Sequence, residues 1–274
     1  MRQTIINLYR VRDWIKTFGI VIIGFVIGKI FLNPLLLLVG VLQSICLFAF
    51  LYIVDDFNDS FVEKRKKFIG RLIQKKIIDI KTGFTLVLLP FIISFIIAIS
   101  SFSKIYFVVY LLYLFFAVTY SISKLRMGDR PFFDVIFNVV FFSLIFVLSV
   151  IFAGRSFTET ALFILIWFAF YIFSQELIHQ IAHYSIDTKS TAKFLGKPET
   201  IKLLQISFLL SALAGVFLFY QFANLRIFAT VMILFSLVRF VFSVKFSSKT
   251  NFEFLRDRIG GLIEAFIYFI LLLI

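Results

Sequence analysis

Carboxylate and basic side chains alternate over a short segment that follows a long apolar run. Asp56, Asp59 and Glu63 are three and four residues apart, so a helix that continues through the segment places them on one face. The basic residues that follow at once are Lys64, Arg65, Lys66, Lys67 and Arg71. Mg²⁺ prefers oxygen ligands and keeps several waters, so a few carboxylates and a substrate's phosphates hold it while Lys and Arg neutralise the remaining charge. The segment predicts a metal-bridged phosphate site, and the alternative is a solvated, charge-rich loop between membrane helices.

A second polar segment interrupts the apolar pattern further along the chain. Its ionisable residues, at steps of three, four and four, are Glu176, His179, His183 and Asp187. One helix face would therefore carry two imidazoles between two carboxylates, in a place where ionisable groups are costly and usually face a polar cavity. Three interpretations stay open: a metal site of the histidines, a polar face satisfied by neighbouring helices, and a partnership of Asp187 with the Asp56 group across a shared cavity.

The chain around these segments is too apolar for a soluble globular protein. Of its 274 residues 61% are hydrophobic and 16% charged, and the mean hydropathy is +1.04. We expect an integral membrane protein with one domain over residues 1–274, because spans and short connections fill nearly the whole length. The net charge of +13 does not indicate nucleic acid, since the basic residues lie between hydrophobic segments. Cys46, the single cysteine, provides neither a disulfide framework nor a thiolate metal site.

Apolar segments long enough to cross a hydrocarbon core of about 30 Å recur along the chain. The predicted spans are 14–32, 34–54, 83–103, 105–122, 132–154, 158–182, 199–221, 224–244 and 254–274. They predict an all-α polytopic membrane protein, a bundle of about nine transmembrane helices. The basic N-terminus leads into a full-length span without a small-residue cleavage site, so we expect mature protein and no signal peptide.

The basic residues gather in alternate connections between these spans. One side receives the N-terminal segment, the run 64–81 and the connections after the fourth, sixth and eighth spans. The other side holds little beyond Lys29, Lys104, Arg155 and Arg226. Because cytoplasmic loops are enriched in Lys and Arg, the N-terminus and both polar segments are predicted to be cytoplasmic and the C-terminus to lie outside.

The first polar segment, YIVDDFNDSFVEK, resembles the N-D-x-x-D-x-x-x-D signature of the UbiA-type intramembrane prenyltransferases. Asp56 and Asp59 match, Asp55 stands in place of the Asn, and Glu63 replaces the last Asp. ELIHQIAHYSID is similar to the second motif of the family, in which two aspartates are four residues apart. Asp187 matches the second aspartate, and His183 occupies the place of the first.

Two further segments carry the resemblance. YSISKLRMGDRPFFDVIFN stands as in the family's loop between the fourth and fifth helices, with Tyr120, Ser121, Lys124, Arg126, Arg130, Pro131, Asp134 and Asn138. RVRDWIKTFGIVI resembles the family's opening segment, with Arg10, Trp14 and Lys16. Besides Asp55, Glu63 and His183, the chain departs from the family at Leu72, where a Pro is frequent, and it has no Gly-x-x-Thr after Asp187.

The resemblance implies a central cavity open to the cytoplasmic face, in which a polyprenyl diphosphate is ionised and its prenyl group passes to a lipid or aromatic acceptor. It implies Asp56, Asp59 and Asp187 as catalytic residues, which with Glu63 hold Mg²⁺. The substrate-binding residues it implies are Lys16, Asp55, Arg71, Tyr120, Lys124, Arg126, Arg130, Asp134, Asn138 and His183. No nucleic-acid partner is expected.

Two alternatives remain open. One is transfer of a phosphosugar such as phosphoribose to a polyprenyl phosphate, and the other is an inactive protein that keeps a lipid-diphosphate cavity. The substitutions Glu63 and His183 favour the inactive protein. A neutral imidazole brings no negative charge to a metal and a protonated one attracts phosphate. We therefore expect His183 to contact the diphosphate or a weakly held second metal.

Overall fold

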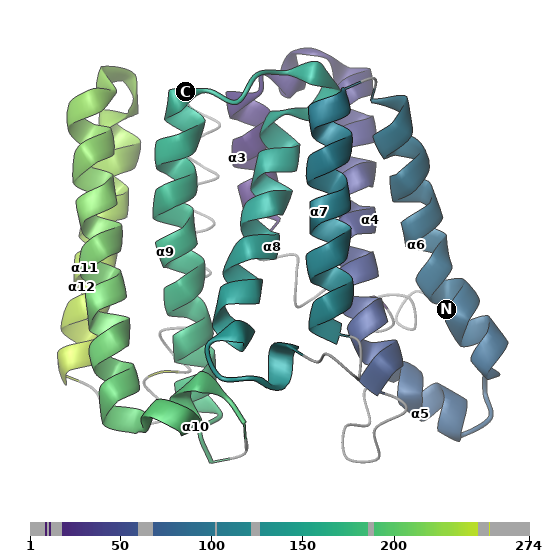
Figure 1. Ribbon diagram of the computed structural model, residues 1–274. Coiled ribbons are helices and arrows are strands. Elements are labelled where there is room, and N and C mark those ends of the chain that lie inside the picture. Colours follow the sequence, from purple (N-terminus) through teal and green to yellow (C-terminus); the bar gives the residue numbers. More distant parts are fainter. Residues whose placement is uncertain are drawn as a thin grey trace. The chain divides into compact units, whose positions relative to one another are not determined.

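The computed structural model describes residues 9, 11, 18–59, 68–101, 103–121, 127–185, 189–245 and 252. All regular elements in these ranges are helices, and none of the described residues lies in a strand (Figure 1). The elements are α3 (Gly19–Ile27), η1 (Ile30–Leu32), α4 (Pro34–Asp59), α5 (Phe68–Gln74), α6 (Ile80–Ser100), α7 (Lys104–Ser121), η2 (Met127–Asp129), α8 (Phe133–Val150), η3 (Phe152–Gly154), α9 (Glu159–Ala182), α10 (Thr191–Leu195), α11 (Lys197–Gln221), η4 (Ala223–Leu225) and α12 (Arg226–Lys245).

Seven of the described helices are long and apolar enough to cross a membrane. They are α4, α6, α7, α8, α9, α11 and the stretch formed by η4 and α12. They confirm an all-helical multi-pass chain and agree with seven of the predicted spans. Within the first predicted span, 14–32, the structure describes residues 18–32, which form the nine-residue α3 and the short η1. The last predicted span, 254–274, lies outside the described residues. The count of nine helices stays a prediction.

The chain packs as two compact units. The first unit comprises the described residues of 1–126 and 144–156, and the second those of 127–143 and 157–274. Helix α8 contributes its first part to the second unit and its last part to the first. The prediction of a single domain stays a prediction.

In the first unit α4 packs against α6 and α7, and polar side chains join these helices inside the apolar interior. The Tyr113 hydroxyl of α7 donates to the carbonyl oxygen of Leu47 in α4 (2.6 Å). Ser94 of α6 and Tyr110 of α7 share a hydrogen bond of 2.8 Å. A buried hydroxyl has no water to bind, so each of these contacts favours one arrangement of the three helices.

The first unit also holds the short helix α5 against the carboxyl end of α4. A Cβ at Gly83 of α6 would lie 3.1 Å from the Phe57 ring of α4 and 3.2 Å from Ile73 of α5. Three helices therefore meet at a position where a Cβ would fit only if a neighbouring side chain moved by a few tenths of an ångström. α6 begins at Asp79, whose carboxylate accepts the N–H of Thr82 (2.7 Å) as an N-cap.

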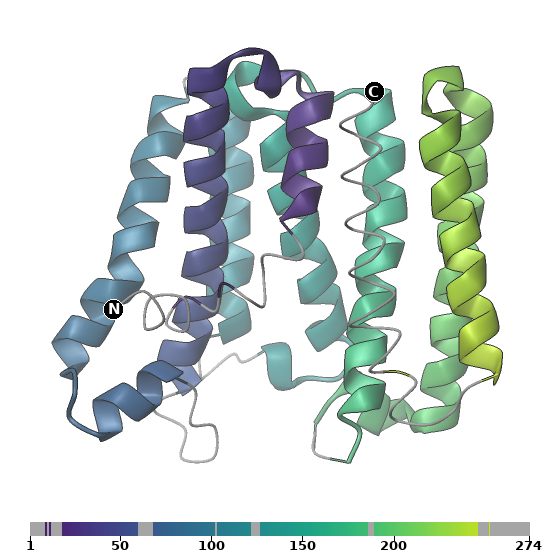
Figure 2. The ribbon, with the colours of Figure 1, turned by 180° about the vertical axis from the view of Figure 1, so that it is seen from behind.

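In the second unit α9, α11 and α12 run alongside one another, with α11 packed against both of the others (Figures 1 and 2). Gly215 lets α11 approach α12, because a Cβ there would lie 2.8 Å from Ile233. Ser236 of α12 donates to Ser211 of α11 at 3.0 Å. Small residues and interhelical hydroxyl bonds of this kind are common between membrane helices. The polar ends of α9 and α11 are joined by α10, which contacts both helices.

Candidate functional site

The carboxyl end of α4 carries the first predicted group of acids. Asp56 is 1% exposed and Asp55 is half-buried, and Asp59 is the last residue of α4 that the structure describes as helical. The last turn of α4 contains no basic residue. Because the macrodipole makes the carboxyl end of a helix negative, these acids concentrate negative charge where a helix least favours it. Such an end is stabilised by a cation.

Predicted substrate-binding residues flank this acidic end within the first unit. Arg71 lies in the last turn of α5 and is exposed, on a helix that packs against α4. Tyr120 is half-buried near the end of α7, which also packs against α4. The described part of the first unit thus places Arg71 and Tyr120 on helices that contact the acid-bearing helix.

Asp134 lies in the first turn of α8, and its carboxylate is saturated by donors of the second unit. Oδ1 accepts the Val135 N–H at 2.8 Å and the Thr191 hydroxyl. Oδ2 accepts the Thr191 N–H at 2.9 Å and Gln180 Nε2 at 2.8 Å. The side chain is 3% exposed. Removing a carboxylate from water costs free energy unless it is hydrogen-bonded. The four donors and the positive amino end of α8 offset this desolvation cost.

Gln180 connects Asp134 to two other elements, and the sequence analysis did not identify it. Its amide also donates to Glu176 Oε1 at 3.4 Å, and its carbonyl oxygen accepts the Ala192 N–H of α10 at 3.0 Å. The signal was present in the sequence, because an amide inside an apolar helix usually needs a buried partner. That partner could not be named, since Asp134 is 46 residues away.

The residue before α8 has an unusual backbone. Phe132 has a φ of 69°, in the left-handed region that costs a bulky L-residue about 1–2 kcal/mol. Its N–H donates to Thr191 Oγ1 at 2.7 Å. Arg130, two residues before Phe132, is predicted to bind the diphosphate and has an exposed side chain. Its carbonyl oxygen accepts the Asp134 N–H at 3.0 Å. Asn138 donates through its amide to the Asp134 carbonyl oxygen at 2.7 Å.

The two histidines lie together at the end of α9. The helix ends at Ala182 with His183 as its C-cap, and the His183 N–H donates to the His179 carbonyl oxygen at 3.0 Å. The imidazole centroids are 4.5 Å apart. The proposed common helix face therefore extends from Glu176 as far as His183. Asp187 falls outside the described residues.

Arg239 is a buried cation that the sequence analysis also missed. It lies in the membrane-spanning part of α12, is 1% exposed, and its guanidinium lies over the rings of Tyr171, Phe208 and Phe235. The centroid distances are 5.3, 4.9 and 5.1 Å, respectively. Aromatic faces stabilise a desolvated guanidinium. A lone Arg within an apolar span was the available signal.

Comparison with known proteins decides the family. The sequence pattern of the UbiA prenyltransferase family matches residues 17–253. The chain belongs to this family. No curated protein matches it.

Solved structures of UbiA homologues share the fold of this UbiA-family chain. A homologue from Archaeoglobus fulgidus bound to GPP and Mg²⁺ is 15% identical, with a TM-score of 0.74 and coverage of 98% of this chain and 99% of that one. A UbiA homologue from Archaeoglobus fulgidus bound to DMAPP and Mg²⁺ is 17% identical, with a TM-score of 0.75 and coverage of 98% of this chain and 99% of that one. The structure of a digeranylgeranylglyceryl phosphate synthase is 14% identical, with a TM-score of 0.69 and coverage of 99% of this chain and 95% of that one. The resemblance found in the sequence is confirmed for the family and the multi-pass membrane fold.

Several residues that the family resemblance implies lie outside the described residues. They are Lys16, Glu63, Lys124, Arg126 and Asp187, together with the side chain of Asp59. Among the side chains that the structure describes, no group of three or more His, Cys, Asp or Glu residues could hold a metal ion. The donor type at the end of α4 nevertheless fits Mg²⁺, because carboxylate oxygens are its preferred protein ligands and this helix end is negative.

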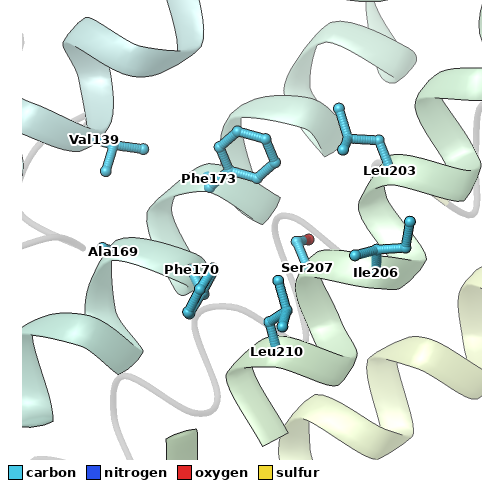
Figure 3. Close-up of a pocket in the computed structure, with 8 residues that line it drawn as sticks. All are labelled: Val139, Ala169, Phe170, Phe173, Leu203, Ile206, Ser207 and Leu210. Carbon is cyan, nitrogen blue, oxygen red and sulfur yellow. The ribbon is translucent and has the colours of Figure 1, made fainter. Parts of the chain in front are cut away.

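An apolar groove of about 240 Å³ lies between α8, α9 and α11 in the second unit (Figure 3). It is lined by Val139, Ala169, Phe170, Phe173, Leu203, Ile206, Ser207 and Leu210. Its one hydroxyl, on Ser207, donates to the Leu204 carbonyl oxygen at 2.7 Å. The lining suits a hydrocarbon chain and offers no cation to a diphosphate.

Proposed function

We propose that this protein transfers a prenyl group from a polyprenyl diphosphate to an acceptor and releases diphosphate with the assistance of Mg²⁺. The observation that carries the proposal is the acidic carboxyl end of α4 in a chain of the UbiA prenyltransferase family. Carboxylates placed at the negative end of a helix weaken the fold unless a cation binds them. A magnesium diphosphate supplies that cation and explains why the acids stand there.

The reaction breaks the bond between the allylic carbon of the substrate and its diphosphate oxygen. The bonding electrons leave with the diphosphate, and the acceptor's nucleophilic atom forms the new bond to carbon and loses its proton. Bound Mg²⁺ would supply positive charge for the leaving group. Asp56, Asp59, Glu63 and Asp187 are proposed to hold it.

Basic and polar side chains have a separate task in the proposal, which is to bind and orient the diphosphate. The residues assigned to it are Lys16, Arg71, Lys124, Arg126, Arg130, Tyr120, Asp55, Asn138 and His183. Cationic groups fixed around a leaving group stabilise the charge that develops on it, because they need no reorganisation during the reaction. Asp134 belongs to the same predicted set.

The proposed orientation places the N-terminus and the polar segments in the cytoplasm, on the basis of the loop charges. Cysteine-accessibility labelling tests it, after replacement of the single native Cys46. Cysteines at positions 66, 128 and 193 should react from the cytoplasmic side, and one at 274 from the other side. Labelling of positions 66 and 128 from opposite sides would rule out a common substrate site.

Incubation of the purified protein with radiolabelled prenyl diphosphates and lipid extracts, with and without Mg²⁺, tests the reaction itself. Labelled lipid and free diphosphate should form only with Mg²⁺. Asp56→Ala should abolish both products, and the exposed Glu199→Ala should not.

Donor choice separates the two alternatives. Labelled phosphoribosyl diphosphate that reacts with a polyprenyl phosphate would replace the proposal with phosphosugar transfer. Binding of prenyl diphosphate without any turnover would indicate the inactive lipid-diphosphate protein.

A further inference from the structure

We propose that Asp134, Gln180 and Thr191 form a positioning clasp that holds the turn of residues 130–132 so that Arg130 is presented to the substrate's diphosphate. The presentation of Arg130 rests on the proposed function. The hold on the turn rests only on the geometry of the second unit. The name "clasp" is used below for these three side chains.

The turn must be stabilised by tertiary contacts, because one of its residues has a backbone conformation that its side chain disfavours. Phe132 has a φ of 69°, which L-residues with bulky side chains rarely adopt. Such conformations persist only where the surroundings over-determine them, and they are found disproportionately at functional sites. Arg130 lies two residues earlier with its side chain exposed, so the backbone conformation at Phe132 sets the position of Arg130 relative to the start of α8.

Thr191 is the contact between the turn and the clasp. Its hydroxyl accepts the Phe132 N–H at 2.7 Å and donates to Asp134 Oδ1. A hydroxyl has one hydrogen, so donation to Asp134 turns its lone pairs toward Phe132. The orientation of Thr191, and with it the strained turn, therefore depends on the Asp134 carboxylate.

Gln180 fixes the other side of Asp134. Its amide nitrogen donates to Asp134 Oδ2 at 2.8 Å, and its carbonyl oxygen accepts the Ala192 N–H at 3.0 Å. The Thr191 N–H donates to the same Oδ2 at 2.9 Å. The clasp thus joins α8, α9 and α10 through one carboxylate. The turn is bound to it through the hydrogen bond from the Phe132 N–H to Thr191.

The same geometry argues against direct substrate binding by Asp134. Both carboxylate oxygens already accept two hydrogen bonds each from the chain, and the side chain is 3% exposed. A ligand would have to displace donors that already bind these oxygens, which is costly. Asp134 acts on substrate through Arg130, as a positioning residue.

The test uses two substitutions that act on the turn in opposite ways. Thr191→Val keeps the side-chain shape and removes the hydroxyl, so the turn loses its hold. We expect the KM for prenyl diphosphate to rise about tenfold, because a displaced Arg130 binds the diphosphate less well. Glycine adopts a positive φ without a side-chain penalty. Phe132→Gly in the Thr191→Val protein should therefore return the KM to near the wild-type value.

Two control variants separate this effect from general damage. Phe132→Ala removes the same ring but keeps a Cβ, so it should not rescue Thr191→Val. Thr200→Val makes the same change at another fully buried threonine, whose hydroxyl donates to the Gly196 carbonyl oxygen at 2.8 Å. It should leave the KM unchanged. Rescue by Phe132→Ala, or an unaltered KM in Thr191→Val, would overturn the proposal.

Hydrogen exchange measured by mass spectrometry gives a result that does not depend on activity. The amides of Asp134 and Ile136 donate to the carbonyl oxygens of Arg130 and Phe132, at 3.0 and 2.9 Å, respectively. Thr191→Val should speed their exchange about tenfold, and added Phe132→Gly should reverse the change. Unchanged exchange overturns the clasp even if the protein is an active prenyltransferase. Failure of every prenyl diphosphate to react contradicts the proposed function, and exchange then decides whether the clasp holds the turn.

Discussion

Acidic side chains lie at the amino end of one helix and at the carboxyl end of another in this protein, and their surroundings differ. Asp134 lies in the first turn of α8, where backbone N–H groups and the positive end of the helix dipole face it. Asp55 and Asp56 lie at the carboxyl end of α4, where the dipole is negative and the last turn has no basic residue. Asp134 accepts four hydrogen bonds from its own chain.

The difference indicates which acids serve the fold and which serve a ligand. An acid at the amino end of a helix is stabilised by the chain itself, so its removal weakens the fold. An acid at the carboxyl end opposes the helix dipole, so the dipole does not stabilise it, and we expect such an acid to serve a ligand. Substitution of Asp134 should therefore lower stability first and affect activity only through Arg130, whereas substitution of Asp56 should affect activity directly.

The largest expected effect is the loss of activity in Asp56→Asn. The amide keeps the shape of the side chain but removes the negative charge that the Mg²⁺ diphosphate requires, so diphosphate release should fall about 10²–10³-fold. The thermal midpoint in detergent should fall less than that of Asp134→Asn, because the substitution also removes a like charge from the negative helix end. A variant that keeps its turnover, or one that loses activity only by unfolding, would break the contrast with Asp134.

Ligand binding should stabilise the protein through the acids of α4. Mg²⁺ with a non-reacting prenyl diphosphate analogue, at one hundred times the dissociation constant, should add about 2.7 kcal/mol to the free energy of unfolding. The unfolding midpoint of Asp56→Asn should not respond to the pair. An equal shift in that variant would show that Asp56 takes no part in binding.

Stability should decrease most in Asp134→Asn. Asparagine places an NH₂ group against donors that need an acceptor, and leaving such buried groups unsatisfied costs about 1–3 kcal/mol. Thermal unfolding in detergent measures the loss. Glu199→Gln is the matched control, since this acid is 57% exposed and pairs only locally with Lys202. Equal midpoints for Asp134→Asn and wild type would contradict the assignment of Asp134 to the fold.

Much of this architecture could be predicted from the sequence, because spans are set by length and apolarity. The range 158–182 agrees with α9 to one residue. The acids Asp55 and Asp56 were found because they break an apolar run at the end of a span. The family could be predicted because each of its motifs is a short run of neighbouring residues, and the motifs follow one another in a fixed order along the chain.

The partners of buried polar groups could not be predicted. Gln180 signalled a buried partner, but neither Gln180 nor Thr191 indicated that the partner is Asp134, because these contacts join residues 46 and 57 positions apart. Asp134 was assigned to substrate by resemblance, whereas its geometry supports a positioning role. The left-handed Phe132 was also invisible, since a positive φ at a bulky residue is imposed by tertiary contacts and opposes its own preference.

The smallest expected effect concerns Asp79, another acid at a helix end. It caps the amino end of α6, and hydrogen bonds from Thr82 lower the pKa of its carboxyl. A lowered pKa in the folded state means that the stabilisation is complete above the unfolded pKa of about 3.9 and is lost as the pH falls through the lower folded value. Asp79→Ala should therefore lower the thermal midpoint slightly at neutral pH and flatten its decrease in acid. Asp79→Asn should keep the neutral midpoint, because Asn caps equally well. Neither variant should change diphosphate release, and a raised midpoint in Asp79→Ala would show that position along the helix does not decide what an acid does in this protein.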